Sequence, residues 1–176
     1  MKINIFGSTG IIGSKTLDII NNYFPLIKIN LLCSNTNVRK LIRQIEIYSP
    51  KYVYINDSTK IDFLKKNIKK NINFITPQNI DFKKNFFDLT IAIGVVYALT
   101  LTDAIMFLKK IKFITKKNNT FITLASYNTK KDLEIFQKWS LLGNLILKKE
   151  DWKILLNHCN YKGDYKFINA DNLNLK

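Results

Sequence analysis

The sequence predicts an α/β protein that forms a single domain around a doubly wound parallel β-sheet. Three observations lead to this class. Apolar, strand-like runs alternate with amphipathic helical segments from residue 3 onward, a glycine-rich turn joins the first strand to the first helix, and the chain has 176 residues. That length suits one domain with a sizeable core, and it is short for a cofactor domain plus a full catalytic domain.

The first half of the chain repeats the pattern of strand and helix three times. Residues 27–32 alternate and then become apolar, as expected of a parallel strand that is buried on both faces. Apolar residues recur at helical spacing over 38–48. We expect strands over 3–6, 27–32 and 52–55 and helices over 14–20, 38–48 and 61–68, the last capped by Asp57 or Ser58.

The second half of the chain is less regular. We expect strands at 73–75, 88–93 and 120–124. Helices are expected over 102–110, 133–142 and 150–157, with Trp139 pointing inward in the second of them and a polar tail after the third. Asp103 near the start of the first helix and Lys109 near its end complement the helix dipole.

A glycine-rich turn follows the first strand, with the sequence Gly7-Ser8-Thr9-Gly10-Ile11-Ile12-Gly13. Gly7 lets the chain turn sharply, Gly10 lets a pyrophosphate approach the backbone, and Gly13 lets the helix pack close to the sheet. The unpaired amides of the first helical turn then face the anion. The turn predicts a Rossmann-like dinucleotide site, and the alternative is a glycine-rich turn in an unrelated α/β domain.

The loop after the second strand distinguishes the two nicotinamide cofactors. In Rossmann-like folds an acidic residue in this loop binds the ribose of NAD and repels the extra phosphate of NADP. Here the loop is Ser34-Asn35-Thr36-Asn37, and Arg39 and Lys40 follow it without an acidic residue. The charge favours NADP. The two basic side chains either bind that phosphate or solvate a helix face.

Two stretches of sequence point to one family. They are Gly-Ser-Thr-Gly-x-Ile-Gly followed by Thr16-Leu17-Asp18-Ile19, and Asn37-Val38 followed by Ser49-Pro50-Lys51-Tyr52-Val53. In order and spacing they resemble the amino-terminal part of the 1-deoxy-D-xylulose 5-phosphate reductoisomerase family, which uses NADPH. The resemblance is strongest over residues 1–68 and weakens toward residue 125. It implies an NADP-binding Rossmann-like domain over 1–125 and a degenerate continuation toward the family's catalytic region over 126–176.

The resemblance also implies the cofactor contacts. The whole turn from Gly7 to Gly13, Ser8 included, forms the cradle, and Thr9, Gly10, Ile11 and Ile12 line the pyrophosphate and nicotinamide side. Asn35, Thr36 and Asn37 correspond to the loop that the family uses for the adenosine phosphate, although the family usually has a basic residue at the position of Thr36. Gly94 corresponds to the far wall, where Tyr97 replaces a second glycine and narrows or blocks the pocket.

The catalytic sequence motifs of the family are missing from the chain. The family converts 1-deoxy-D-xylulose 5-phosphate to 2-C-methyl-D-erythritol 4-phosphate in the non-mevalonate route of isoprenoid biosynthesis, and it uses a divalent metal ion. The family's Asn-Lys-Glu motif aligns without a gap with Thr115-Lys116-Lys117. With an insertion it aligns with Ser126-Tyr127-Asn128, and we prefer this second alignment. The family's metal-binding motif aligns with Asp151-Trp152-Lys153-Ile154, where Lys153 replaces a carboxylate.

We therefore expect no catalytic residue and no metal site in this chain. His158 and Cys159 lack further ligands at metal-binding spacing. The function that we expect is that of the NADPH-binding, cofactor half of the reductoisomerase, an oxidoreductase, inactive as an isolated chain. The alternative is a non-catalytic Rossmann-like interaction protein that completes a partner subunit, so a homo- or hetero-oligomer remains open.

Composition limits the other function classes. The net charge is +15, but the lysines are scattered among Ile and Asn, a pattern that base-composition bias explains, and aromatic residues do not interleave with them. We therefore do not expect a nucleic-acid partner, and a basic nucleic-acid-binding module, with a salt-dependent affinity for DNA or RNA, is kept as a third alternative. Cys33 and Cys159, with no secretory leader pattern, predict a cytoplasmic protein. The longest uncharged stretch, 89–102, is shorter than the roughly 20 residues of a membrane-spanning helix, so we expect no membrane association.

Overall fold

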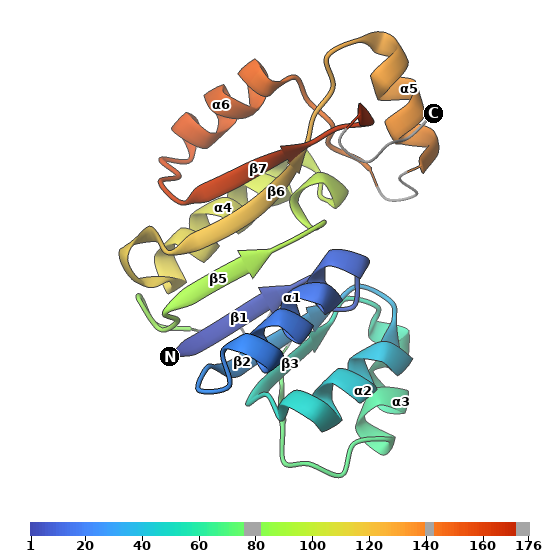
Figure 1. Ribbon diagram of the computed structural model, residues 1–176, viewed down its shortest axis with the longest axis vertical. Coiled ribbons are helices and arrows are strands. Elements are labelled where there is room, and N and C mark those ends of the chain that lie inside the picture. The colour runs from blue at the N-terminus through green and yellow to red at the C-terminus, as the bar shows by residue number, and fades with distance from the viewer. Residues whose placement is uncertain (76–81, 140–142, 172–176) are drawn as a thin grey trace.

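The protein is an α/β fold built on one parallel β-sheet, which confirms the fold class predicted from the sequence (Figure 1). The computed structural model describes residues 1–75, 82–139 and 143–171. The sheet has seven strands in the order β4-β3-β2-β1-β5-β6-β7, and each neighbouring pair is parallel. The order reverses between β1 and β5, so the sheet is doubly wound around that pair.

The strands are β1 (Lys2–Phe6), β2 (Lys28–Ser34), β3 (Tyr52–Ile55), β4 (Asn73–Phe74), β5 (Leu89–Ala92), β6 (Thr120–Ala125) and β7 (Asp164–Ile168). The α-helices are α1 (Ile11–Tyr23), α2 (Val38–Tyr48), α3 (Ile61–Lys66), α4 (Leu101–Ile114), α5 (Lys130–Trp139) and α6 (Lys149–His158). Three short 3₁₀ helices lie between them: η1 (Ser58–Lys60), η2 (Val96–Ala98) and η3 (Lys116–Asn118).

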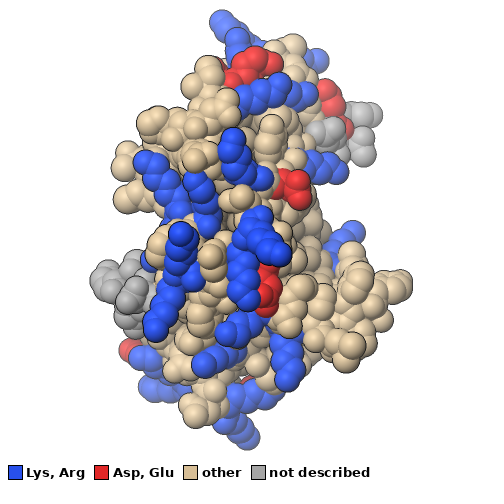
Figure 2. All heavy atoms as spheres, turned by 90° about the vertical axis from the view of Figure 1, so that its left-hand side faces the viewer, with Lys and Arg blue, Asp and Glu red and all other residues tan. Residues whose placement is uncertain are grey.

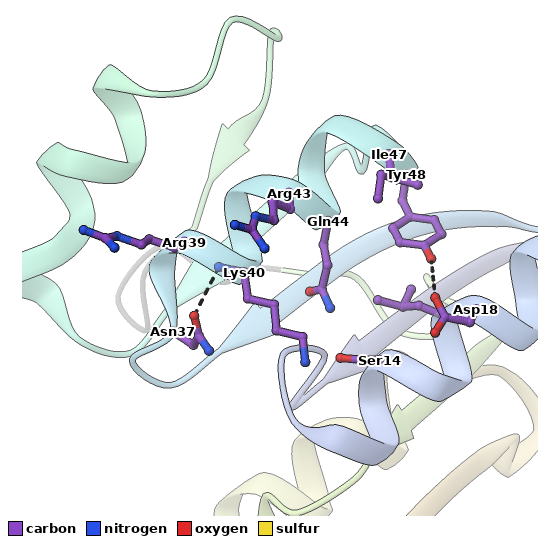
Figure 3. A pocket seen from close by; sticks show the side chains of 10 residues that line it. Ser14, Asp18, Asn37, Arg39, Lys40, Arg43, Gln44, Ile47 and Tyr48 are labelled. Carbon is purple, nitrogen blue, oxygen red and sulfur yellow. Dashed lines mark hydrogen bonds between the residues drawn. The ribbon is translucent and has the colours of Figure 1, made fainter.

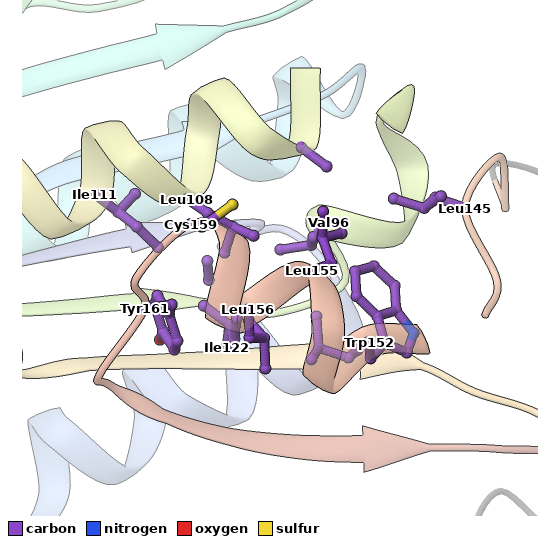
Figure 4. Close-up of a cluster of buried hydrophobic side chains, with 13 residues drawn as sticks. Val96, Leu108, Ile111, Ile122, Leu145, Trp152, Leu155, Leu156, Cys159 and Tyr161 are labelled. Atoms are coloured by element: carbon purple, nitrogen blue, oxygen red, sulfur yellow. The ribbon is translucent and has the colours of Figure 1, made fainter. Parts of the chain in front are cut away.

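The two largest of four hydrophobic clusters pack helices against the sheet. One joins α1, α2 and α3 to β1, β2 and β3, with Leu17, Leu41 and Leu64 buried in it. The other joins α4 and α6 to β5 and β6, and Trp152 and Leu108 are fully buried in it (Figure 4). Because helices of both clusters pack against the sheet, its central strands β1, β2, β5 and β6 are largely buried, as parallel strands usually are.

The carboxyl-terminal region differs from the sequence prediction. We expected a polar tail after residue 157, but Asp164–Ile168 forms β7, which pairs in parallel with Phe121–Ala125 of β6. The first three residues of β7 are exposed, so its sequence lacks the apolar run of an interior strand. The helix predicted over 102–110 extends to Ile114, because Ile111 and Ile114 are also buried.

Two further sequence predictions, a helix over 133–142 and the absence of a membrane-spanning helix, concern the described residues only in part. The helix expected over 133–142 is α5, which begins at Lys130; residues 140–142 and the side chain of Trp139 lie outside the described residues. Among the described residues, no helix is long and apolar enough to cross a bilayer.

Candidate nucleotide site

The glycine turn lies at the carboxyl end of β1, beside the point where the strand order reverses. Gly7 has φ +75°, and a Cβ atom there would lie 2.2 Å from the carbonyl oxygen of Ile93 at the end of β5. A side chain at this position would therefore collide with the neighbouring strand. In open α/β sheets ligands bind outside the carboxyl ends of the strands at such a reversal.

Gly13 brings α1 close to the turn. A Cβ atom at Gly13 would lie 2.2 Å from the carbonyl oxygen of Gly7, so the helix could not approach this closely with any side chain there. Gly10 is the N-cap of α1, and its amide donates to the carbonyl oxygen of Gly7 at 3.1 Å. The turn is thus a compact loop held by its own backbone.

The first amides of α1 have no cap. The N-cap Gly10 provides no side-chain hydrogen bond, and the first turn contains no acidic residue. The first intrahelical bond shown at this end joins the Ser14 amide to the Gly10 carbonyl, which leaves the amides of Ile11, Ile12 and Gly13 at the open end of the helix. The side chains of Ile11 and Ile12 are 75% and 43% exposed. Unpaired amides beside exposed apolar side chains suit an anion attached to a planar organic group.

Ser8 supports the turn from inside. It is buried, and its hydroxyl donates to Oε1 of Gln44 at 2.8 Å, while Nε2 of Gln44 donates to the Ser8 carbonyl at 2.8 Å. Thr9 shares a 2.8 Å hydrogen bond with the hydroxyl of Ser34 at the end of β2. The Ser8 side chain therefore faces the protein interior, and its place in the site is structural.

Gln44 is a site residue that the sequence reasoning missed. It occupies a buried position of α2 between Leu41 and Ile45. A polar residue on the apolar stripe of an amphipathic helix is the signal that could have identified it, because a buried amide needs hydrogen-bond partners.

The loop after β2 lies next to the glycine turn. Asn37 is the N-cap of α2, and its side-chain oxygen accepts from the Lys40 amide at 3.1 Å. Asn35 accepts a 3.0 Å hydrogen bond from Asn56. The ammonium of Lys60 donates to the carbonyl oxygen of Thr36 at 3.1 Å. A basic side chain therefore reaches the loop at Thr36, but it comes from η1.

Lys60 was also missed, since it lies 24 residues beyond Thr36 in the sequence. It pairs with Asp57 at 3.2 Å, and the hydrogen bonds from Thr59 and Lys60 hold the pKa of the Asp57 carboxyl below its ordinary value. Only the neighbouring positions of the carboxyl ends of β2 and β3 bring Lys60 to this loop.

A groove of about 440 Å³ lies between α1 and α2 (Figure 3). Its lining includes Ser14 and Asp18 of α1 and Lys40, Arg43 and Tyr48 of α2. Figure 3 shows the Lys40 side chain extending toward Ser14, while at the far end the Tyr48 hydroxyl donates to Asp18. The end of the groove nearest the glycine turn is therefore basic.

The charges in the first turns of the helices distinguish α1 and α2, beside the glycine turn, from the other α-helices. The first turns of α3, α4, α5 and α6 contain Asp62, Asp103, Asp132, and Glu150 with Asp151. The first turns of α1 and α2 contain no acidic residue. Acidic residues at a helix N-terminus neutralise the positive end of the dipole. The two helices that flank the glycine turn keep this positive potential, and Arg39 and Lys40 of α2 add to it.

Gly94 lies across the turn, after β5. It has φ +70°, and its amide donates to the Thr123 hydroxyl at 2.9 Å. The hydroxyl of Tyr97 lies 3.4 Å from the position of a Gly94 Cβ atom, and the Tyr97 ring packs edge-on against Phe136 at 6.0 Å. Burial raises the pKa of Tyr97. The phenol ring therefore lies over the wall that Gly94 forms.

The residues aligned with the family's catalytic motifs follow β6 and begin α6, and the contacts shown for them are structural. Ser126 is buried and its amide donates to the Ile168 carbonyl, and Asp132 accepts from the Asn128 amide. Asp151 is exposed in the first turn of α6. Among the described ranges, no group of three His, Cys, Asp or Glu side chains could hold a metal ion.

Comparisons with known proteins agree with this geometry. A sequence profile of the family described as 1-deoxy-D-xylulose 5-phosphate reductoisomerase matches residues 3–87. The enzyme of that name from Thermoanaerobacter sp. (strain X514) is 41% identical over 75 residues, which cover 43% of this chain and 20% of the relative. The enzyme from Pelagibacter ubique (strain HTCC1062) is 37% identical over 162 residues, which cover 81% of this chain and 41% of the relative.

The chain thus spans less than half the length of these relatives. The solved 1-deoxy-D-xylulose 5-phosphate reductoisomerase from Zymomonas mobilis, in complex with NADPH, superposes with a TM-score of 0.54 at 16% identity, covering 94% of this chain and 38% of that one. This likeness shows a shared fold. The chain therefore resembles the amino-terminal part of the 1-deoxy-D-xylulose 5-phosphate reductoisomerase family in sequence, and it shares the fold of an enzyme of that name that was solved with NADPH.

Proposed function

We propose that this chain binds NADPH across the turn from Gly7 to Gly13. The observation that supports the proposal is the uncapped start of α1, which the close approach of Gly13 to Gly7 presents at the sheet reversal. A pyrophosphate there would accept hydrogen bonds from the amides of Ile11–Gly13 and would favour the positive end of the helix dipole. The exposed side chains of Ile11 and Ile12 would cover the apolar face of the cofactor.

The extra phosphate of NADPH would lie at the loop of Asn35, Thr36 and Asn37. Lys40 lines the groove together with Asn37, and the Lys60 ammonium donates to the Thr36 carbonyl, so both cations lie near that position. A phosphate gains most from charge-assisted hydrogen bonds with such groups. NADH lacks this phosphate, so these lysines would favour NADPH over NADH.

The wider function that we propose is that of the cofactor half of a reductoisomerase acting on 1-deoxy-D-xylulose 5-phosphate in the cytoplasm. When bound, NADPH supplies a hydride to such a substrate. The residues aligned with the family's metal-binding word are the exposed Asp151 and the cationic Lys153. A lysine in that place opposes a divalent ion, so we propose that the chain binds no catalytic metal and is inactive alone.

A second candidate function is a non-catalytic partner that completes another subunit. The position of Tyr97 favours it, because the phenol ring lies over Gly94, where the nicotinamide half of a cofactor would enter. Replacing Tyr97 with Gly would then raise the affinity for NADPH. An unchanged affinity would remove this observation as an argument.

Isothermal titration of the chain with NADPH and with NADH tests the binding proposal. We expect NADPH to bind at least tenfold more tightly, a difference of about 1.4 kcal/mol. Lys40→Gln should abolish most of this preference, and Lys66→Gln, on the exposed side of α3, should leave it intact. Equal affinities for the two cofactors, or no heat with either, would refute the proposal.

Turnover is tested separately. The chain is mixed with NADPH, a manganese salt and 1-deoxy-D-xylulose 5-phosphate, and the absorbance of NADPH is followed. We expect no oxidation above the rate without substrate. Steady oxidation that depends on substrate would show that the isolated chain is active and would overturn that part of the proposal.

A further inference from the structure

Lysines gather at the edge of the sheet where the strands begin, opposite the glycine turn. Figure 2 shows this side of the molecule, where basic side chains cover much of the surface and acidic ones are few. We define the basic edge as the lysines between β1 and β7 on this side: Lys2, Lys83, Lys84, Lys109, Lys112, Lys116, Lys117 and Lys162.

Backbone contacts make the basic edge continuous. The Asn85 amide donates to the Phe113 carbonyl at 3.0 Å, which places the segment of Lys83 and Lys84 against the end of α4. The Thr120 hydroxyl donates to the Tyr161 hydroxyl at 2.7 Å, which places Lys162 beside the start of β6. Lysines that are scattered in the sequence therefore share one surface.

The acidic groups at this edge do not neutralise it. The described acidic residues there are Asp88 and Asp164. Asp88 already accepts hydrogen bonds from the Lys116 ammonium at 2.6 Å and the Lys2 amide at 2.5 Å, and these contacts lower its pKa. The opposite edge of the same strands carries both signs of charge: Lys130, Lys131, Lys148 and Lys149 lie near Asp103, Asp132, Glu150 and Asp151 in the chain or at neighbouring helix starts.

Neither helix dipoles nor base composition explains this asymmetry. The negative end of α4 favours Lys109 and Lys112, but Lys83, Lys84 and Lys162 lie in loops. A bias in base composition would add lysines to both edges of the sheet, without removing acidic residues from one. The one-sided distribution points to an anionic partner.

We propose that the basic edge binds the phosphate backbone of a nucleic acid without reading its sequence. Strands lie about 4.8 Å apart, so the edge from β1 to β7 spans about 15 Å, and a duplex presents a charge about every 1.7 Å along its axis. Lysines are mobile point charges that suit such a polymer, whereas base recognition favours the forked guanidinium of arginine. The basic edge contains no arginine among its described residues.

A nucleic acid fits this edge better than an anionic membrane does. A membrane surface is bound by charges together with a row of apolar side chains. Here the exposed large apolar side chains are Met1 before β1, Phe113 at the end of α4 and Tyr165 in β7, which come from three separate elements. The Lys110 ammonium lies 5.8 Å from the centre of the Phe113 ring.

The test measures binding of the whole chain to a fluorescent duplex of about 20 base pairs at about 50 to 200 mM salt. We expect the logarithm of the binding constant to fall linearly with the logarithm of the salt concentration, with a slope of about −0.9 for each phosphate contacted. The edge variant replaces Lys83, Lys84, Lys109 and Lys162 with Glu. The control variant replaces Lys130, Lys131, Lys138 and Lys148 with Glu and changes the net charge by the same amount. The edge variant should bind at least tenfold more weakly, and the control less than threefold.

Three results would overturn the proposal: no binding of the unmodified chain at the lowest salt, an equal loss in both variants, or tighter binding to vesicles that contain anionic lipid than to the duplex. Thermal melting checks that both variants fold. If the edge variant does not fold, the corresponding pair of Lys→Gln variants replaces it, with an expected loss of at least threefold for the edge variant alone.

Discussion

Gly7 and Gly13 determine the shape of the candidate nucleotide site through a single carbonyl group. The Gly7 oxygen accepts from the Gly10 amide, and it occupies the space that a Gly13 side chain would need. The sequence predicted both glycine roles, because a glycine turn between a strand and a helix has known geometry. Gln44 was missed although its polar side chain interrupts the apolar stripe of α2, and its partner Ser8 is known only from the fold. Lys60 could not be predicted, since only the fold brings it to the loop at Thr36.

Gly13→Ala should lower the free energy of unfolding by about 1–3 kcal/mol, because its methyl group would lie against backbone that cannot rotate away. Gly10→Ala is the matched control. A Cβ atom there would lie 3.4 Å from the Gly7 oxygen, and its backbone is extended, so the change should stay within about 0.5 kcal/mol. Urea unfolding measures both. Equal losses would contradict the close approach described for Gly13.

At the scale of elements, the first half of the chain followed its sequence pattern closely. α2 and β3 begin and end where they were predicted, because each has a clear apolar pattern and a turn at both ends. β7 was missed because it is an edge strand with three exposed residues, and its apolar side chains contact the sheet only near its end. Such a strand is stabilised by pairing with β6, which no local pattern reveals.

The attachment of α6 to the sheet gives a prediction. The indole nitrogen of Trp152 donates to the Ala125 carbonyl at the end of β6 at 2.6 Å, and the ring is buried. Trp152→Phe removes this bond and part of the packing, and it should cost about 1–2 kcal/mol of unfolding free energy. Ile154→Ala, whose side chain is 68% exposed on the same helix, should change it by less than about 0.5 kcal/mol. Similar losses at both positions would argue against the docking of α6 through Trp152.

At the scale of the whole molecule, the sheet separates two surfaces. The glycine turn and the uncapped start of α1 lie where the strands end, and the basic edge lies where the strands begin. The sequence predicted the first surface, because its residues are adjacent in the chain. The second combines residues from four separate segments, so the sequence presented them only as scattered lysine pairs. The net charge of +15 was visible in the sequence, but its one-sided distribution was not.

Acid should destabilise the fold through Asp88, which joins Lys116 to the start of β1. Its pKa is lowered from 3.8 in the folded state, chiefly by the hydrogen bond from Lys116. A depressed pKa means that the stabilisation is complete above the ordinary value and is lost as pH falls through the folded-state value. Stability should therefore fall below about pH 4.

Asp88→Asn and Lys116→Gln should each flatten this dependence of stability on pH in urea unfolding, and the double variant should resemble either one. Additive effects would contradict the pairing.

The most direct test of the nucleotide site is a titration of the isotope-labelled chain with NADPH, followed through its amide NMR signals. We expect the largest shifts at residues 7–13 and 35–40, at lower concentrations of NADPH than of NADH. Shifts that are absent, or that appear only at the basic edge, would contradict the assignment of the glycine turn as a nucleotide site.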